Sequence, residues 1–70
     1  MQEEDKKVRK RSYRITIIFK DEIIVEKFET EFIAIETIKK MKILFPNIFI
    51  GGALEEKRKS WTVIWTLGNN

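Results

Sequence analysis

The chain has 70 residues, of which 43% are hydrophobic, and a formal net charge of +3. It contains no cysteine and no histidine, which excludes disulfide bonds and thiolate metal sites and removes the commonest general acid–base group. A chain of this length forms one small domain. No apolar run approaches the roughly 20 residues that span a bilayer. We therefore expect a soluble, cytoplasmic protein with no metal, no cofactor, no membrane contact and no enzymatic activity.

The positive charge is concentrated at the N-terminal end. Residues 1–14 include six basic and three acidic side chains, whereas the rest of the chain has eight of each. Val8 is the one apolar residue between the charges of residues 1–11. Such a segment cannot bury enough surface to offset the entropy lost on ordering. We expect a flexible basic arm over residues 1–11.

Residues 12–28 predict a β-hairpin. In "SYRITIIFK" the larger apolar residues alternate with polar ones, which is typical of a strand with one buried face. The buried set is Tyr13, Ile15, Ile17 and Phe19. After Asp21-Glu22, "IIVEKF" predicts a second strand, but its register stays open. Either Ile24 and Phe28 face the core, with Glu26 between them, or Ile23 and Val25 do.

Residues 30–45 predict a helix. Thr30 is a good N-cap residue, and Pro46 disfavours helical geometry at Phe45, so the helix is expected to stop there. Apolar residues recur at spacings of four, three and four, which predicts one inward stripe. This stripe consists of Ala34, Ile38, Met41 and Phe45.

The C-terminal part predicts two more strands. The third begins at Ile48, and Gly51-Gly52 suggests a bulge or a close backbone approach within it. Residues 55–59, "EEKRK", are expected to form a charged loop, residues 60–67 the last strand, and residues 68–70 a frayed end. The order of the strands in the sheet stays open. If the first and last strands were neighbours, the charged loop would lie away from the basic arm.

The order strand, strand, helix, strand, strand predicts an α+β fold. We expect a two-layer ββαββ sandwich over residues 12–67, with one helix packed on a mainly antiparallel four-stranded sheet. In "SWTVIWT", Trp61, Val63 and Trp65 alternate with Thr62 and Ile64. Because burying a large side chain contributes about 1.5–3 kcal/mol, both indoles are expected in the core beneath the helix, or one in the core and one at its rim. The alternative is that one tryptophan stays accessible and stacks on a nucleic-acid base.

The first functional hypothesis is nucleic-acid binding. Clustered cations gain affinity for DNA or RNA phosphates through counterion release, with little base specificity. The candidate residues lie in the arm, at the start of the first strand and in the charged loop. They are Lys6, Lys7, Arg9, Lys10, Arg11, Arg14, Lys57, Arg58 and Lys59.

The alternative hypothesis is a small accessory or inhibitor protein that docks on a protein partner or forms a homodimer. Exposed apolar patches mark such surfaces. The back of the helix and the outward side of the sheet carry hydrophobic residues beyond those that one small core absorbs. The candidate residues are Ile18, Phe32, Ile33, Lys39, Ile43 and Ile64.

Overall fold

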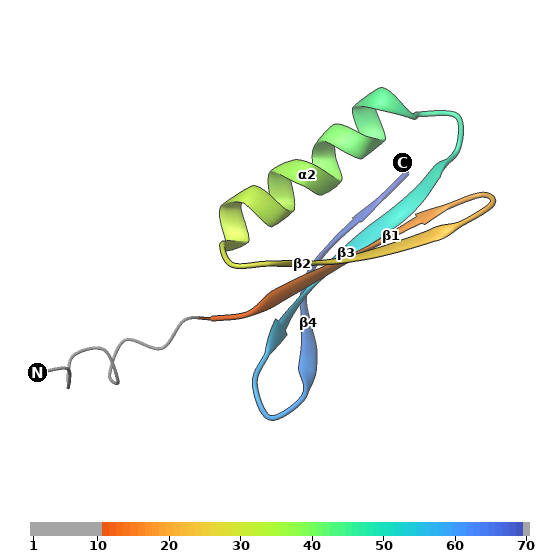
Figure 1. Cartoon of the computed structure of the whole chain (residues 1–70). Coiled ribbons are helices and arrows are strands. Elements are labelled where there is room, and N and C mark those ends of the chain that lie inside the picture. Colours follow the sequence, from red (N-terminus) through yellow and green to blue (C-terminus); the bar gives the residue numbers. More distant parts are fainter. Residues whose placement is uncertain (1–10, 70) are drawn as a thin grey trace, which may run out of the picture.

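The computed structural model describes residues 11–69, which form four strands and one helix (Figure 1). The elements are β1 (Tyr13–Phe19), β2 (Ile23–Phe28), α2 (Glu31–Leu44), β3 (Phe49–Lys57) and β4 (Trp61–Gly68). This order confirms the predicted α+β, ββαββ sandwich. The basic arm expected over residues 1–11 lies outside the described residues, apart from Arg11.

The four strands form one antiparallel sheet in the order β2-β1-β3-β4. The two central strands, β1 and β3, are paired on both sides, and β2 and β4 form the edges. Helix α2 lies along one side of the sheet, and no other described element covers the opposite side (Figure 1). We call the side under α2 the inner face and the opposite side the outer face.

The core lies between α2 and the inner face of the two central strands. Its buried members come from β1, α2 and β3, and Ala34 and Ile38 are the fully covered helix residues. The complete set of buried hydrophobic residues is Tyr13, Ile15, Ile17, Phe19, Ala34, Ile38, Phe49 and Leu54. The predicted burial of alternate β1 residues is therefore confirmed. Phe45, expected at the end of the helix stripe, lies just after the helix and packs edge-on against Phe19 at a centroid distance of 5.8 Å.

Gly52 is where the helix comes closest to the sheet. A Cβ atom at this position would lie 2.6 Å from Cγ2 of Ile38. Real Cβ atoms do not approach other atoms so closely, so only glycine fits beneath this turn of α2. The expected close backbone approach is confirmed here. A register shift also occurs beside it, because Ile18 pairs with Gly51 whereas Phe19 pairs with Phe49.

The hairpin register is the first of the two alternatives. Ile17 pairs with Ile24 and Tyr13 pairs with Phe28, so Ile24 and Phe28 share the inner face. Ile23 and Val25 consequently project from the outer face. Since β2 is an edge strand, Glu26 on its inner side remains exposed to solvent.

The predicted charged loop was too long. Strand β3 continues through the two glycines to Lys57, and the turn to β4 contains only residues 58–60. Glu55 and Glu56 stay in the strand because arginines of neighbouring segments pair with both carboxylates. The strand order places this turn beside the N-terminal end of β1, where the Lys57 N–H donates to the Ser12 carbonyl at 2.9 Å. The arrangement with first and last strands adjacent is therefore wrong.

The prediction that both tryptophans lie beneath the helix was also wrong. Trp65 pairs with Leu54 whereas Val63 pairs with Glu55, so Ile64 is an extra residue in β4 without a partner in β3. This bulge changes which residues share a side of the strand. Trp65 and Ile64 pack against the core, and both are half-buried. Trp61 and Val63 belong to the outer face, so the two indoles are not sealed together beneath α2.

Candidate interaction surface

The outer face is organised in rows that cross all four strands. In two of these rows the register places large aliphatic residues on the β2–β1 half and small residues on the β3–β4 half, whereas in the third row the aliphatic residue is Val63 on β4. Read from β2 to β4, the rows are Ile23, Ile18, Gly51 and Gly68; then Val25, Thr16, Ala53 and Thr66; then Lys27, Arg14, Glu55 and Val63. Beyond this last row, Trp61 lies at the N-terminal end of β4, opposite Lys57.

Aliphatic side chains on this face are strongly exposed. The exposed fractions are 64% for Ile23, 55% for Val25 and 53% for Val63, with 38% for Ile18. Single exposed hydrophobic residues are normal on protein surfaces, but several on one sheet face form a patch. Such a patch has the composition of a protein-docking surface.

Trp61 gives this face an aromatic end. The Arg14 guanidinium lies over its ring, 4.3 Å from the centroid, and the Lys57 ammonium lies 5.5 Å away. Cations are attracted to the negative face of an indole, most strongly where both groups are partly shielded from water. The half-buried Trp61 therefore rests among cationic side chains on the outer face.

The charges at the centre of the outer face are internally balanced. Arg14 on β1 faces Glu55 on β3, and Nε of Arg14 donates to Oε1 of Glu55 at 2.7 Å. Both side chains are largely shielded, with exposed fractions of 29% and 17%. An arginine held in this way attracts phosphate less than a free one, because the carboxylate competes for the same donors.

A second ion-pair cluster lies at the same end of the molecule, on the inner side. Glu56 accepts hydrogen bonds from Arg11 at 2.7 Å and from Arg58 at 2.9 Å, and its side chain is only 7% exposed. The bonds from Arg58 and Arg11 lower the pKa of the Glu56 carboxyl. The same contact raises the pKa of Arg11, mainly through its hydrogen bond to Glu56. We call Arg11, Glu56 and Arg58 the Glu56 cluster.

The structure divides the nine candidate nucleic-acid residues into three groups. Four of them, Lys6, Lys7, Arg9 and Lys10, lie outside the described residues. Three arginines, at positions 11, 14 and 58, are engaged by Glu55 or Glu56. The remaining two, Lys57 and Lys59, are exposed at the β3–β4 turn. Among the described candidates, only Lys57 and Lys59 therefore lie outside these ion pairs.

The back of α2 carries most of the other candidate interface residues. Phe32 and Ile43 are 72% and 76% exposed, and Ile33 is also exposed, as the helical pattern predicts. Lys39 is exposed and lies 3.7 Å from the Glu36 carboxylate. Ile64 differs from these residues, because the bulge in β4 turns it toward the core instead of the outer face.

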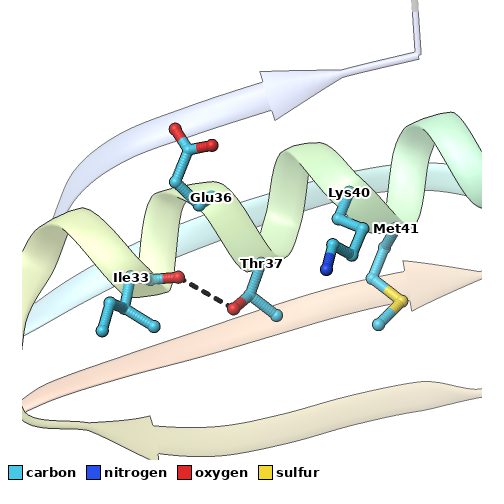
Figure 2. A pocket seen from close by; sticks show the side chains of 5 residues that line it. All are labelled: Ile33, Glu36, Thr37, Lys40 and Met41. Atoms are coloured by element: carbon cyan, nitrogen blue, oxygen red, sulfur yellow. Dashed lines mark hydrogen bonds between the residues drawn. The ribbon is translucent and has the colours of Figure 1, made fainter.

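Two hollows lie along this helix. One has a volume of about 370 Å³ and is lined by Ile33, Glu36, Thr37, Lys40 and Met41 (Figure 2). Within it, the Thr37 hydroxyl donates to the Ile33 carbonyl at 2.8 Å, so its polar group is used by the helix itself. The other has a volume of about 570 Å³ and is lined by Glu36, Lys39, Lys40, Ile43 and Leu44. Since the residues that line each hollow all belong to α2, neither hollow is an enclosed binding pocket.

Sequence reasoning missed four residues of the outer face. Ile23 and Val25 were one of two register alternatives, and no glycine in the Asp21-Glu22 turn fixes the choice. Trp61 and Val63 were assigned to the core, because regular alternation along β4 was assumed. The bulge at Ile64 leaves no residue signature, since isoleucine is an ordinary strand residue.

Comparison of the chain with protein-family models, with curated proteins and with solved structures found no match. Within residues 11–69, no three acidic side chains lie close enough together to hold a metal ion. The helix in this range is not of the length and apolar character needed to cross a membrane.

Proposed function

We propose that this protein is a small protein-interaction module that docks through the outer face of its sheet. The occupant is the aliphatic surface of another protein chain. The observation that carries the proposal is the strong exposure of Ile23, Val25 and Val63 on a sheet face that no described element covers. A protein surface is favoured over a nucleic acid because the central cation, Arg14, is already paired with Glu55.

The proposal is tested by affinity capture with two matched variants. Val25→Lys places a charge on the outer face in the middle row of edge strand β2, whereas Ile43→Glu places one on the back of α2, at a site that is 76% exposed. Neither residue is buried, so both variants are expected to fold. A protein captured by the wild type and by Ile43→Glu, but lost with Val25→Lys, supports the proposal. Retention of every captured protein, including untagged copies of the chain, by Val25→Lys contradicts it.

Nucleic-acid binding is the second candidate, and it has one supporting observation. Trp61 is half-buried on the same uncovered face, beside Arg14 and Lys57. Base stacking on an aromatic side chain contributes about 1–3 kcal/mol per base, and cations at such a site interact with the backbone.

This second candidate is tested with Trp65→Phe, in which Trp61 is the remaining tryptophan. Addition of a single-stranded oligonucleotide should quench its emission, and the affinity should fall steeply as salt rises. Removal of residues 1–11 from the same variant should weaken binding if the arm contributes phosphate contacts. An emission spectrum that is unchanged at low salt contradicts nucleic-acid binding by this face.

A further inference from the structure

The outer face has two unlike halves that meet between β1 and β3. On one side stands a ridge made by Ile18, Ile23 and Val25, and on the other lies a trough floored by Gly51, Ala53 and Gly68. The ridge and the trough share the same rows, because each row crosses the whole sheet. A surface with a ridge and a trough of equal length, side by side, is complementary to itself.

We propose that the protein docking on this face is a second copy of the chain, related by a two-fold axis that runs along the strands between β1 and β3. The inference rests on the proposed function and names its partner. Rotation about such an axis exchanges the two halves and keeps the rows in register. It places β1 over β3 of the second copy and β2 over β4 of the second copy. The same contacts then occur twice, as in every isologous dimer.

Shape complementarity follows from this operation. Ile18 lies over Gly51 of the second copy, and Ile23 lies over Gly68 of the second copy. In the next row Val25 lies over Thr66 of the second copy. In these two rows each large aliphatic side chain therefore meets a small residue, which allows the two sheets to approach to about 10 Å. A rotation without exchange of halves would instead set ridge against ridge.

Charge complementarity follows from the same axis. Arg14 lies over Glu55 of the second copy, and Glu55 lies over Arg14 of the second copy. Since the two residues already pair within each chain at 2.7 Å, the dimer joins them in a network of four alternating charges. No central charge is buried without a partner. Lys27 lies over Val63 of the second copy at the rim, where its stem covers the valine and its ammonium reaches water.

The dimensions suit a small interface. Four strands about 4.8 Å apart give a face roughly 19 Å wide and about 20 Å long. The strands of two aligned packed sheets cross at about 30°, which displaces the contacts at the edge strands by about 4 Å. This displacement is smaller than the spacing of roughly 6.6 Å between rows, so the rows stay matched. An interface of this size belongs to the weaker class, so a dissociation constant of about 1–100 µM is expected.

The test uses a pair of complementary variants. Gly68→Leu fills the trough, and a Cβ atom at this position would have no neighbouring atom within 4 Å in the single chain. Ile23→Ala shortens the ridge at a residue that is 64% exposed. By sedimentation velocity up to about 500 µM, the wild type should dimerise and Gly68→Leu should bind itself at least tenfold more weakly. A mixture of the two variants should form a heterodimer, because the added side chain of one occupies the space vacated in the other.

Several results would overturn the inference. These are a wild type that is monomeric throughout this range, a dimer that Gly68→Leu leaves intact, or a mixture that shows no heterodimer. Ile43→Glu is the control and should dimerise like the wild type, whereas its selective loss of dimers would assign them to the back of α2. If the wild type is monomeric but Val25→Lys no longer captures a protein that the wild type captures, the partner is not a second copy. The proposed function then still stands. A monomer whose Trp61 emission is quenched by an oligonucleotide contradicts both.

Discussion

Glu56 is the one buried charged side chain among residues 11–69, and two arginines hold it. Their hydrogen bonds lower the pKa of this carboxyl in the folded protein. Folding therefore favours the ionised form, and this contribution to stability is fully present above the ordinary glutamate pKa of about 4.3. It is lost as the pH falls through the lower folded value. The Glu56 cluster thus makes the join between β1 and the β3–β4 turn sensitive to acid.

We predict that Glu56→Gln removes part of the acid sensitivity. The variant should be less stable than the wild type near neutral pH, because glutamine carries no charge for Arg11 and Arg58. The gap should narrow as the pH falls from about 5 to about 3, since the wild type loses its ionised carboxylate there. Thermal unfolding followed by circular dichroism at each pH measures this. Glu29→Gln, at an exposed glutamate between β2 and α2, is the control, and a constant gap for Glu56→Gln would refute the prediction.

Gly52 provides a second prediction at the residue scale. Gly52→Ala would place Cβ 2.6 Å from Cγ2 of Ile38. Because Cγ2 is attached directly to the branched Cβ of Ile38, rotation farther along the side chain cannot move it away. We expect a loss of about 1–3 kcal/mol as α2 is displaced. Ile38→Ala alone should cost about 2–5 kcal/mol, but the double variant should lose less than the sum. Urea unfolding measures all three, and Gly68→Ala, which meets no neighbour, is the matched control.

At the scale of the element, β4 is decisive because one extra residue separates its two tryptophans. Trp65 packs against the core, whereas Trp61 lies on the outer face with Arg14. We predict that Trp65→Ala costs about 2–4 kcal/mol of unfolding free energy, since a half-buried aromatic is removed from the core. Trp61→Ala should cost about 0.5–1 kcal/mol, the magnitude of an accessible cation–π contact. Equal losses, measured by urea unfolding of dilute samples, would contradict the bulge at Ile64.

The same strand shows where sequence reasoning reaches its limit. Strand β1 was predicted residue by residue, because its alternation is unbroken and its inner side is wholly apolar. The burial of Ala34 and Ile38 also followed from helical spacing. In β4, the three consecutive residues from Val63 to Trp65 are all apolar. Periodicity alone therefore cannot reveal a register shift of one residue. The outer face was consequently misassigned at the end that carries Trp61.

Long-range pairing accounts for the remaining differences. Glu55 and Glu56 look like loop residues when read with the lysines and arginine that follow them. Their partners, Arg14 and Arg11, are 41 and 45 positions away along the chain. The pairing of β1 with β3, which the strand order β2-β1-β3-β4 provides, brings these side chains together. That order could not be chosen from composition or spacing, and it also decides which cations are available to a ligand.

For the molecule as a whole, the balance of buried and exposed hydrophobic residues matters most. Within residues 11–69 the core contains eight buried hydrophobic residues, whereas eleven large ones are exposed. A domain this small buries only about 60% of the surface of its unfolded chain and is marginally stable. Association that covers the outer face would therefore contribute a large share of the stability of each copy.

This coupling gives a prediction for the intact protein. If a dimer of two folded copies unfolds to two separate chains, a tenfold rise in protein concentration stabilises the dimer by about 1.4 kcal/mol. This is about 0.7 kcal/mol for each chain. For a domain of this size that corresponds to a rise of about 3–5 °C in Tm. Differential scanning calorimetry over a hundredfold concentration range measures it. Val25→Lys should show a smaller rise in Tm with concentration, because a lysine in the aliphatic ridge weakens the contact with a second copy, and Ile43→Glu should follow the wild type. A wild-type Tm that does not change with concentration would show that the folded chain is monomeric.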